Sequence, residues 1–474
     1  MSEQALSELL VVLNRGSVGT LRSQLTAALR EAVVSGRLAD GTRLPPSRIL
    51  AAQLGVSRGV VVAAYEQLVM AGYLVARPGM GTVVTSGAMV PEADVDFVPA
   101  YLPKPRDPRW NMHPTWPDVS AFPRADWQAA VQRVLARMEN EAWGYGDPRG
   151  ALELREALAR RVARTRACRA AADCIVITNG SRQAHHLALR LLAERGARRV
   201  AVEDPGWVMQ RLATEDAGME PVPVAVDELG MRVAELGDLG VQAAVLTPAH
   251  QFPSGVTLAA ERRDALLEWA RQSDATIIED DYDADFRYDG EPLPALQSID
   301  PERVITIGSL SKTFAPALRL GWILAPRELA GAAARLKERM DNGSPMLEQL
   351  VIADLESSGR LDRHMRRMAR SYAARRAKLA LAIRRELPDV RVRGIAAGLH
   401  AVVELASDLD EDAVVDAARA RGIALEGVSS YRVLTTPPPA MLALGYANLS
   451  EPAIARAIGT LAEAVADVRA GARR

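Results

Sequence analysis

Lys312 lies in a short turn rich in serine and glycine that directly follows an apolar run. The stretch from Ile305 to Trp322 reads ITIGSLSKTFAPALRLGW, so Ser309, Ser311 and Arg319 are close to this lysine in the chain. A lysine amine can form a Schiff base with an aldehyde, and hydroxyl and guanidinium groups can bind a phosphate. A loop lysine in solvent gives the same local pattern. Other segments must therefore supply the rest of any cofactor site.

The acidic end of a predicted strand supplies two further candidate groups for a cofactor site. The run ATIIED ends at Asp280, and Tyr282 follows two residues later. Pyridoxal 5'-phosphate (PLP) needs an amine, an acid for its pyridine nitrogen, a partner for its ring hydroxyl and donors for its phosphate. Asp280 would keep the pyridine nitrogen protonated, because a nearby carboxylate favours the charged form, and Tyr282 could bind the hydroxyl. The alternatives are a metal-binding acidic cluster, which has no histidine or cysteine nearby in the sequence, or an acidic strand end without function.

Phosphate donors are expected where an apolar run meets a helix. Gly180, Ser181, Arg182 and Gln183 follow the run CIVIT and precede an apolar helical pattern. The free N–H groups and the dipole of a helix N-terminus favour an anion. Trp207 follows a further run, RVAVEDPG, and its ring could lie on a flat cofactor. Taken alone, this tryptophan is better explained as a core or interface aromatic.

The elements that must position these groups alternate along the chain. Short apolar runs separated by helical stretches predict a mainly parallel sheet covered on both faces. A long helical region after Arg327, the run VVELA at 402–406 and a closing helix predict a smaller α+β domain from about residue 340. The expected strands of the large sheet are residues 174–178, 199–203, 242–247, 275–280, 303–308 and 320–325.

Length, composition and charge exclude several classes of protein. The chain has 474 residues, of which 49% are hydrophobic and 25% charged, so it can bury a large core. The net charge of -1 excludes a uniformly basic protein but not a local basic surface. There are two cysteines, without metal-type spacing, and we see no membrane-spanning run and no signal peptide. We expect a soluble cytoplasmic protein.

The chain divides into three parts by composition. Residues 1–85 contain eight arginines and five acids, a net of +3, and are expected to form a DNA-binding domain. Residues 86–123 are rich in proline and are expected to be a linker and an irregular arm. Residues 124–474 would then form the cofactor-binding domain.

The N-terminal part has the pattern of a winged helix-turn-helix. A first helix is predicted over residues 20–35. A second is predicted to start near Pro46 and Ser47, where Ser47 can cap, and to run through Leu54 to Gly55. A third is predicted over 59–71 with Ser57 as N-cap. A two-stranded wing over 72–84 would turn at Pro78 and Gly79. Any single arginine here could instead be a solvated charge. The residues expected to contact DNA are Arg43, Arg48, Ser57, Arg58, Arg77 and Gly79, and those expected in the core are Leu50, Leu54, Val62, Tyr65 and Leu68.

The ordered series in this part resembles a known domain. Residues 41–84 read GTRLPPSRILAAQLGVSRGVVVAAYEQLVMAGYLVARPGMGTVV. This run is similar to the winged-helix domain of GntR-type bacterial regulators over about residues 18–85. The resemblance implies DNA contacts by Arg43, Arg48 and Arg58.

The rest of the chain resembles fold-type I aminotransferases and, with the winged helix in front, the MocR subfamily of GntR-type regulators. The runs that carry this resemblance are AWGYGDPRGALELREALARRVARTR, TPAHQFPSGVTLAAERRDALLEWA, EDDYDADFRY and GSLSKTFAPALRLGW. It implies an internal aldimine of PLP at Lys312, Asp280 at the pyridine nitrogen and Tyr282 at the ring hydroxyl. It also implies Ser309 and Arg319 at the phosphate.

Four positions depart from the pattern or reach beyond one subunit. The resemblance implies that Tyr145 reaches the phosphate of the neighbouring subunit. His250 and Gln251 fall near the position of an asparagine beside the ring in aminotransferases, and their alignment stays open. Trp207 stands where this group usually has a tyrosine.

A winged helix serves no purpose in catalysis, so its fusion to a cofactor pocket indicates a regulator in which ligand binding is coupled to DNA binding. We expect a transcription factor that binds operator DNA as a homodimer, domain-swapped, and senses PLP or an amino compound through its cofactor pocket. Arg432 is the expected effector-binding residue, and an exposed loop arginine is its alternative. Two other functions stay open: a PLP-dependent aminotransferase with a secondary DNA-binding domain, and a DNA-binding regulator whose pocket holds no cofactor. Any transamination by the regulator would be at most a weak half-reaction.

Overall fold

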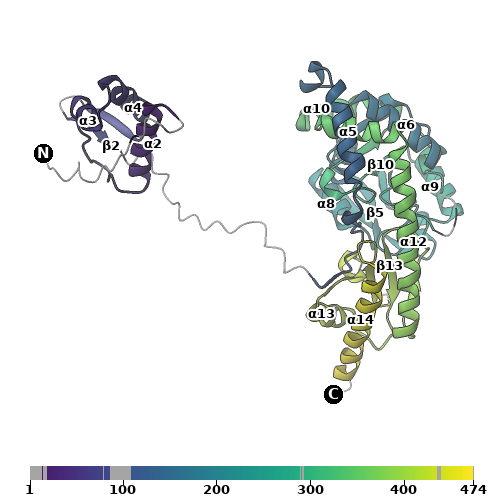
Figure 1. The fold of residues 1–474 in the computed structure, drawn as a ribbon. Coiled ribbons are helices and arrows are strands. Elements are labelled where there is room, and N and C mark those ends of the chain that lie inside the picture. Colours follow the sequence, from purple (N-terminus) through teal and green to yellow (C-terminus); the bar gives the residue numbers. More distant parts are fainter. Residues whose placement is uncertain are drawn as a thin grey trace. The chain divides into compact units, whose positions relative to one another are not determined.

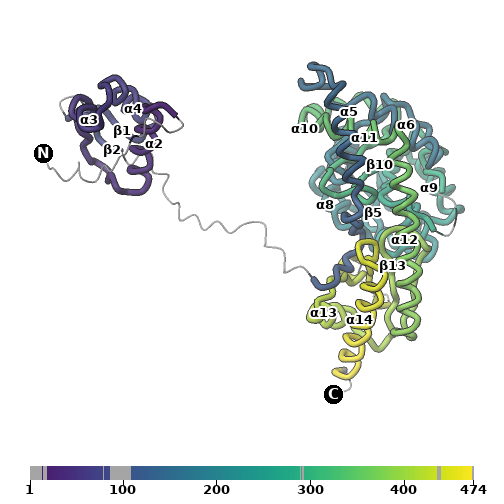
Figure 2. Tube along the Cα trace, viewed as in Figure 1, coloured from purple at the N-terminus to yellow at the C-terminus, as the bar shows by residue number. Residues whose placement is uncertain are grey.

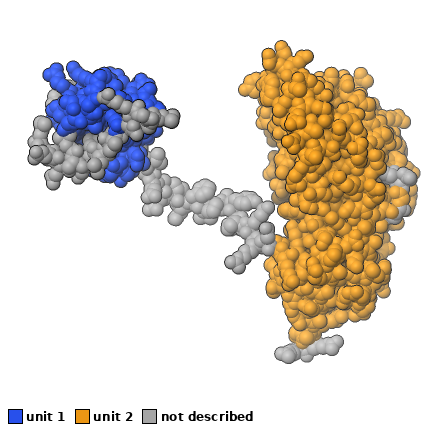
Figure 3. Space-filling view, in the orientation of Figure 1, with its two compact units in different colours: residues 1–103 blue, residues 104–474 orange. Residues whose placement is uncertain are grey.

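The protein is described by a computed structural model that covers residue 13 and residues 19–77, 80–85, 108–288, 290, 293–434 and 439–472. It forms two compact units, one within residues 1–103 and one within residues 104–474 (Figure 3). In these described stretches no helix is long and apolar enough to cross a membrane. The described part of the arm, residues 108–123, belongs to the second unit, and the division predicted at residues 85 and 123 stays a prediction.

The first unit is a winged helix-turn-helix. Its elements are α2 (Leu21–Val34), α3 (Ser47–Leu54), α4 (Arg58–Met70), β1 (Leu74–Arg77) and β2 (Gly81–Val84). Ser57 is the N-cap residue of α4, as predicted. Ser47 was expected to cap α3, but Pro46 holds that position and Ser47 is the first helical residue. The ring of proline fixes φ at a value that suits the start of a helix, so Pro46 can directly precede the first helical residue.

The core of this unit is built by the apolar faces of its three helices. Leu50, Tyr65 and Leu68 are buried as predicted, and Leu54 packs partly buried against them. Val62, expected in the core, is only half-buried, and Val61 is fully buried in its place. One residue turns a helix by about 100°, so an error of one position moves a side chain from the core to its edge.

The second unit contains an eight-stranded sheet in the order β4-β11-β10-β9-β8-β5-β6-β7 (Figure 1). The strands from β10 to β6 are parallel, whereas β11 is antiparallel to β10 and β4, and β7 to β6. The bounds are β4 (Ile175–Thr178), β5 (Arg199–Asp204), β6 (Glu220–Asp227), β7 (Gly230–Met231), β8 (Ala243–Leu246), β9 (Thr276–Asp280), β10 (Val304–Ser309) and β11 (Gly321–Leu324). Six of these eight strands were predicted. The sequence pattern did not indicate β6, because Pro221 and Pro223 disfavour a strand, or the two-residue β7.

Helices cover both faces of this sheet. One face packs on α7 (Ser181–Glu194), α8 (Val208–Asp216) and α10 (Arg327–Asp341). The other packs on α9 (Ala260–Gln272) and, toward β4 and β11, on α5 (Arg124–Arg137), α6 (Leu152–Arg166), α11 (Met346–Ser357) and α12 (Arg360–Glu386). Burial on both faces explains why the strands are apolar throughout, with almost no alternation.

A smaller domain follows α12. Its sheet has the order β12-β13-β16-β15 and is covered by α13 (Glu411–Ala420) and α14 (Glu451–Ala472). The strands are β12 (Arg391–Arg393), β13 (His400–Glu404), β15 (Glu426–Gly427) and β16 (Met441–Gly445). The arm joins this domain, because β3 (Trp110–Asn111) pairs in parallel with β14 (Ile423–Ala424), and Figure 2 shows the dark-blue arm beside the yellow C-terminal elements.

Candidate functional site

One cavity gathers five of the eleven predicted cofactor residues. The carboxyl ends of parallel strands meet at one edge of a sheet, where ligands bind in open α/β folds. Asp280 ends β9, Lys312 follows β10, and Trp207 follows β5. The cavity is lined by Thr115, Ser181, Trp207, Thr247, Phe252, Asp280, Tyr282 and Lys312. Thr115, Thr247 and Phe252 were not indicated by the sequence.

The Lys312 amine is poised between its charged and neutral forms. Burial lowers the pKa of Lys312 to about 8, against the opposing effect of the carboxylates of Asp283 and Asp280. An amine must be neutral to attack a carbonyl carbon, and a desolvated lysine is a common way to obtain one. This lysine is therefore suited to nucleophilic chemistry near neutral pH.

Asp280 is buried and has one carboxylate oxygen without a hydrogen-bond partner. Its other oxygen, Oδ2, accepts a hydrogen bond from Gln210 Nε2 at 3.2 Å and lies 3.3 Å from His185 Nε2. Because Asp280 borders the cavity, the unpaired oxygen Oδ1 is available to a donor on a bound molecule. His185 lies four residues after Ser181 on α7, so the helical period could have identified it as a residue on the same face.

Tyr282 keeps its proton in this site. Burial, with Asp283 as the largest charged contributor, raises the pKa of the Tyr282 phenol well above its usual value. Its hydroxyl lies 3.1 Å from His250 Nδ1, and that nitrogen lies 2.9 Å from Asp283 Oδ2. The phenol can therefore act as a hydrogen-bond donor.

A cradle for an anion lies at the start of α7. Helix α7 begins at Ser181 and has no side-chain cap. Arg319 Nη2 donates to the carbonyl oxygen of Asn179 at 2.7 Å, which places its guanidinium beside this helix start. A Cβ atom on Gly180 would lie 2.9 Å from Arg319 Nη2, and the φ of Gly180 is +87°, so glycine is required here.

The cradle is supported by an ion pair between Lys337 and Asp341, whose side chain is 24% exposed. The carboxylate of Asp341 accepts hydrogen bonds from Asn179 Nδ2 at 3.0 Å and from Gln183 Nε2 at 2.7 Å. Asp341 also pairs at 2.6 Å with Lys337, whose side chain is fully buried. Through its bond to Asp341, Gln183 fixes the loop that carries the cradle, and its predicted place near the phosphate stays a prediction.

Four residues that were predicted to bind the cofactor, Ser309, Ser311, Arg182 and Tyr145, do not line this cavity. Ser309 is buried, its Oγ accepts from the Ser311 backbone N–H at 3.1 Å, and it borders a second small cavity behind Tyr282. Arg182 is exposed at the first turn of α7, and the Tyr145 side chain is 92% exposed. Their roles at a phosphate stay predictions.

His250 and Gln251, whose roles the sequence left open, differ in the structure. The side-chain amide of Gln251 is hydrogen-bonded to nearby loops. Its Nε2 donates to the carbonyl oxygens of Phe252 and of Pro205, which follows β5, and its Oε1 accepts from the Ser254 backbone N–H. His250 instead packs against Tyr282, with ring planes at 21°. Of these two residues, His250 is the one in contact with the tyrosine of the cavity.

Arg432 lies close to the cavity wall. It is half-buried, and its Nε is buried without a hydrogen-bond partner. The preceding residue, Tyr431, packs edge-on against Phe252 with ring centroids 5.0 Å apart. The alternative of an exposed loop arginine is therefore disfavoured by its burial, and its binding to an effector stays a prediction.

The predicted DNA-contacting arginines lie on the surface of the first unit. Arg48 is exposed near the start of α3, and Arg58 is exposed as the first residue of α4, with Nε 3.4 Å from Ser47 Oγ. Arg77 pairs with Gly81 at the end of the wing strands, and the Arg43 guanidinium lies beside Gly81 as well. Pro78 and Gly79, at the predicted turn of the wing, lie outside the described residues.

The fold and the site together define an aminotransferase-type unit that follows a winged helix in the chain. The family model described as "Bacterial regulatory proteins, gntR family" matches residues 21–84, and the model "Aminotransferase class I and II" matches residues 119–461. The chain belongs to the MocR subfamily of GntR-type regulators, in which these two domains are fused.

Two relatives agree with this assignment, and a solved structure agrees with the aminotransferase fold of the second unit. The chain is 30% identical to "Probable rhizopine catabolism regulatory protein MocR" of Rhizobium meliloti, over 96% of each chain. It is 33% identical to "HTH-type pyridoxine biosynthesis transcriptional regulator PdxR" of Corynebacterium glutamicum, over 90% of this chain and 92% of that one. The second unit is similar to a multiple substrate aminotransferase from Thermococcus profundus, with a TM-score of 0.70 and 26% identity over 78% of this chain and 93% of the other.

Proposed function

We propose that this transcriptional regulator holds PLP on Lys312, and that PLP or an amino compound bound in the same pocket controls its binding to operator DNA. The observation that carries the proposal is the unpaired, buried Oδ1 of Asp280 in the cavity that also contains Lys312. A buried acceptor without a partner is costly, and a protonated pyridine nitrogen would satisfy it.

The other residues of the cavity fit the same cofactor. The helix start at Ser181 and the guanidinium of Arg319 would hold the phosphate, and Tyr282 would donate to the ring oxygen. Trp207 would lie against the ring. Bound there, PLP would supply an electrophilic carbon for amines and an electron sink for the bonds next to it.

An effector with a carboxylate would find a partner in Arg432, whose buried Nε has no hydrogen bond. A dimer is supported by the exposed aromatic side chains of Trp143 and Tyr145, which are 62% and 92% exposed. Large aromatic side chains at such exposure are typical of association surfaces.

A working aminotransferase is the second candidate, because a lysine with a pKa of about 8 also suits proton transfer. Steady multiple turnover with an amino donor and a keto acid would favour this candidate. A protein that changes its DNA binding with PLP but turns over at most once would favour the regulator.

The rate at which the protein captures PLP should rise about tenfold between pH 7 and pH 9 and then level off. Below a pKa of about 8 the Lys312 amine is mostly protonated and cannot attack, and above it the amine is neutral. Stopped-flow absorbance after mixing cofactor-free protein with PLP measures this rate. N-acetyl-lysine, whose amine has an ordinary pKa, is the control and should keep accelerating above pH 10. A protein profile that follows the control would contradict the assigned amine.

The proposal is tested by titrating DNA from the region upstream of the protein's own gene with the full chain, with and without PLP and then with candidate amines. We expect the dissociation constant to change at least severalfold when PLP or an amine is added. Equal binding in every condition would reject sensing while leaving DNA binding intact. An unrelated DNA of equal length and composition serves as the control for salt-dependent non-specific binding.

A further inference from the structure

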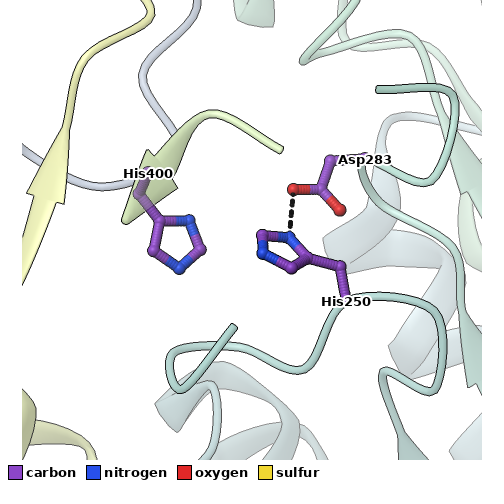
Figure 4. Close-up of side chains that lie close together, drawn as sticks. All are labelled: His250, Asp283 and His400. Carbon is purple, nitrogen blue, oxygen red and sulfur yellow. Dashed lines mark hydrogen bonds and ion pairs between the residues drawn. The ribbon is translucent and has the colours of Figure 1, made fainter. Parts of the chain in front are cut away.

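Two groups of titratable side chains adjoin the site without lining the cofactor cavity. His250, Asp283 and His400 form one group, in which His250 Nδ1 lies 2.9 Å from Asp283 Oδ2 (Figure 4). Lys337 and Asp341 form the other group, in the last turns of α10. The second group is hydrogen-bonded to the segment that carries the cradle, so it has a direct route to a bound anion.

Asp341 is the acceptor on which the polar side chains of this segment converge. Its Oδ2 accepts hydrogen bonds from Asn179 Nδ2 at 3.0 Å and from Gln183 Nε2 at 2.7 Å. The Oε1 atom of Gln183 accepts from the Asn179 backbone N–H at 2.8 Å. Because a backbone N–H only donates, this bond fixes Oε1 on that side of the amide and leaves the Nε2 donor for the carboxylate. Asp341 therefore holds the turn between Asn179 and Gln183 at both of its ends.

This turn contains one half of the cradle and is bonded to the other half. Ser181, the first residue of α7, lies within the turn, and the helix start has no side-chain cap. The carbonyl oxygen of Asn179 accepts from Arg319 Nη2 at 2.7 Å. Asn179 is thus bonded to Asp341 through its side chain and to Arg319 through its backbone. A displacement of Asn179 would move the helix start and the guanidinium out of their common geometry.

Lys337 balances the charge of Asp341. Its side chain is fully buried, and its Nζ lies 2.6 Å from Asp341 Oδ1 and 3.1 Å from Ser344 Oγ. Against the effect of burial, the hydrogen bonds from Lys337 and Gln183 lower the pKa of Asp341, so this carboxyl group is ionised. An ionised carboxylate bonded to the cradle segment would disfavour a second anion nearby, and the ammonium of Lys337 offsets that repulsion.

We propose that Asp341, with its charge balanced by Lys337, is a positioning residue that holds the cradle in the conformation that binds a phosphate group. Its contribution is selective, because it favours PLP over pyridoxal, which has the same ring and aldehyde but no phosphate. The inference rests on the proposed function, since the phosphate belongs to the proposed cofactor.

The test compares the dissociation constants of PLP and of pyridoxal for the full chain, both measured by visible absorbance. Wild-type protein should bind PLP about 100-fold more tightly or better, because a phosphate makes several charge-assisted hydrogen bonds. Asp341→Ala removes the acceptor of the turn and should weaken PLP binding about tenfold, the effect of losing one hydrogen bond to a charged group. Pyridoxal binding should stay within about twofold of wild type, because pyridoxal does not use the cradle.

Two further variants separate charge from hydrogen bonding. Lys337→Met leaves the carboxylate of Asp341 without its counter-charge and should also weaken PLP binding about tenfold. Adding Asp341→Asn to this variant should restore most of the affinity, because the asparagine oxygen accepts from the amides without a charge. The double variant has no unpaired charge, so it also tests the proposal if Asp341→Ala, which leaves a buried lysine unpaired, fails to fold.

Glu194→Ala is the matched control. Glu194 ends α7 and pairs with Arg339 of α10 at 2.8 Å, so this variant removes another ion pair between the same two helices. The helical rise places Glu194 about 20 Å from Ser181 along α7. Both PLP and pyridoxal should bind this variant as they bind wild-type protein.

The outcomes distinguish the two proposals. A wild-type protein that binds PLP and pyridoxal equally well contradicts the proposed phosphate site, and the role of Asp341 falls with it. A wild-type preference for PLP that survives unchanged in both Asp341→Ala and Lys337→Met overturns only the role of the pair. Equal weakening of PLP and pyridoxal in these variants would show that the pair stabilises the unit as a whole, which also overturns the selective role.

Discussion

Replacing Lys312 by alanine should leave the protein without a visible absorption band after incubation with PLP and gel filtration. Lys312 is the lysine in the wall of the cavity, and without its amine the cofactor can be held only by the weaker contacts of Asp280, Tyr282 and Arg319. We expect complete loss of covalently retained cofactor. Absorbance and mass spectrometry of the borohydride-reduced protein measure this retention.

The matched control is Lys378→Ala. Lys378 lies on α12 and does not line the cavity, so this variant should retain the band at wild-type intensity. A band that survives in Lys312→Ala would contradict the assignment of the amine. Melting temperatures of both variants, compared with that of wild-type protein, show whether a lost band reflects unfolding.

Replacing Arg48 and Arg58 together by alanine should weaken binding to operator DNA about 100-fold or more. Both side chains are exposed at the starts of the two helices of the helix-turn-helix, where they can reach bases or phosphates. Each base-reading arginine contributes about 1–3 kcal/mol of discrimination, and each phosphate contact adds to the salt dependence of binding. Fluorescence anisotropy at several salt concentrations measures both effects.

Arg30→Ala is the control for a general loss of positive charge. Arg30 is exposed on α2, outside the helix-turn-helix, and we expect its loss to change binding only slightly. If the double variant at Arg48 and Arg58 bound as tightly as Arg30→Ala, the assigned recognition surface would be wrong. The cofactor band should be unchanged in all these variants, because the cavity lies entirely in the second unit.

Much of the site could be predicted because it depends on local patterns. Lys312, Asp280 and Ser181 each stand at the end of an apolar run, and parallel strands bring such ends to one edge. Thr115 could not be predicted, since it reaches the cavity from an arm whose β3 pairs with residues more than 300 positions later. His250 and Asp283 likewise meet only through tertiary packing under Gly398.

The hairpin between β10 and β11 has a consequence for the affinity of any bound cofactor. Ser309 lies opposite Gly321 in the antiparallel register, and the Leu310 N–H donates to the Leu320 carbonyl at 3.0 Å. The loop closed by these pairs carries both Lys312 and Arg319. The conformational entropy of bringing the amine and the guanidinium together is therefore lost when the sheet folds, not when a ligand binds. Lengthening this loop would weaken binding without removing a single contact.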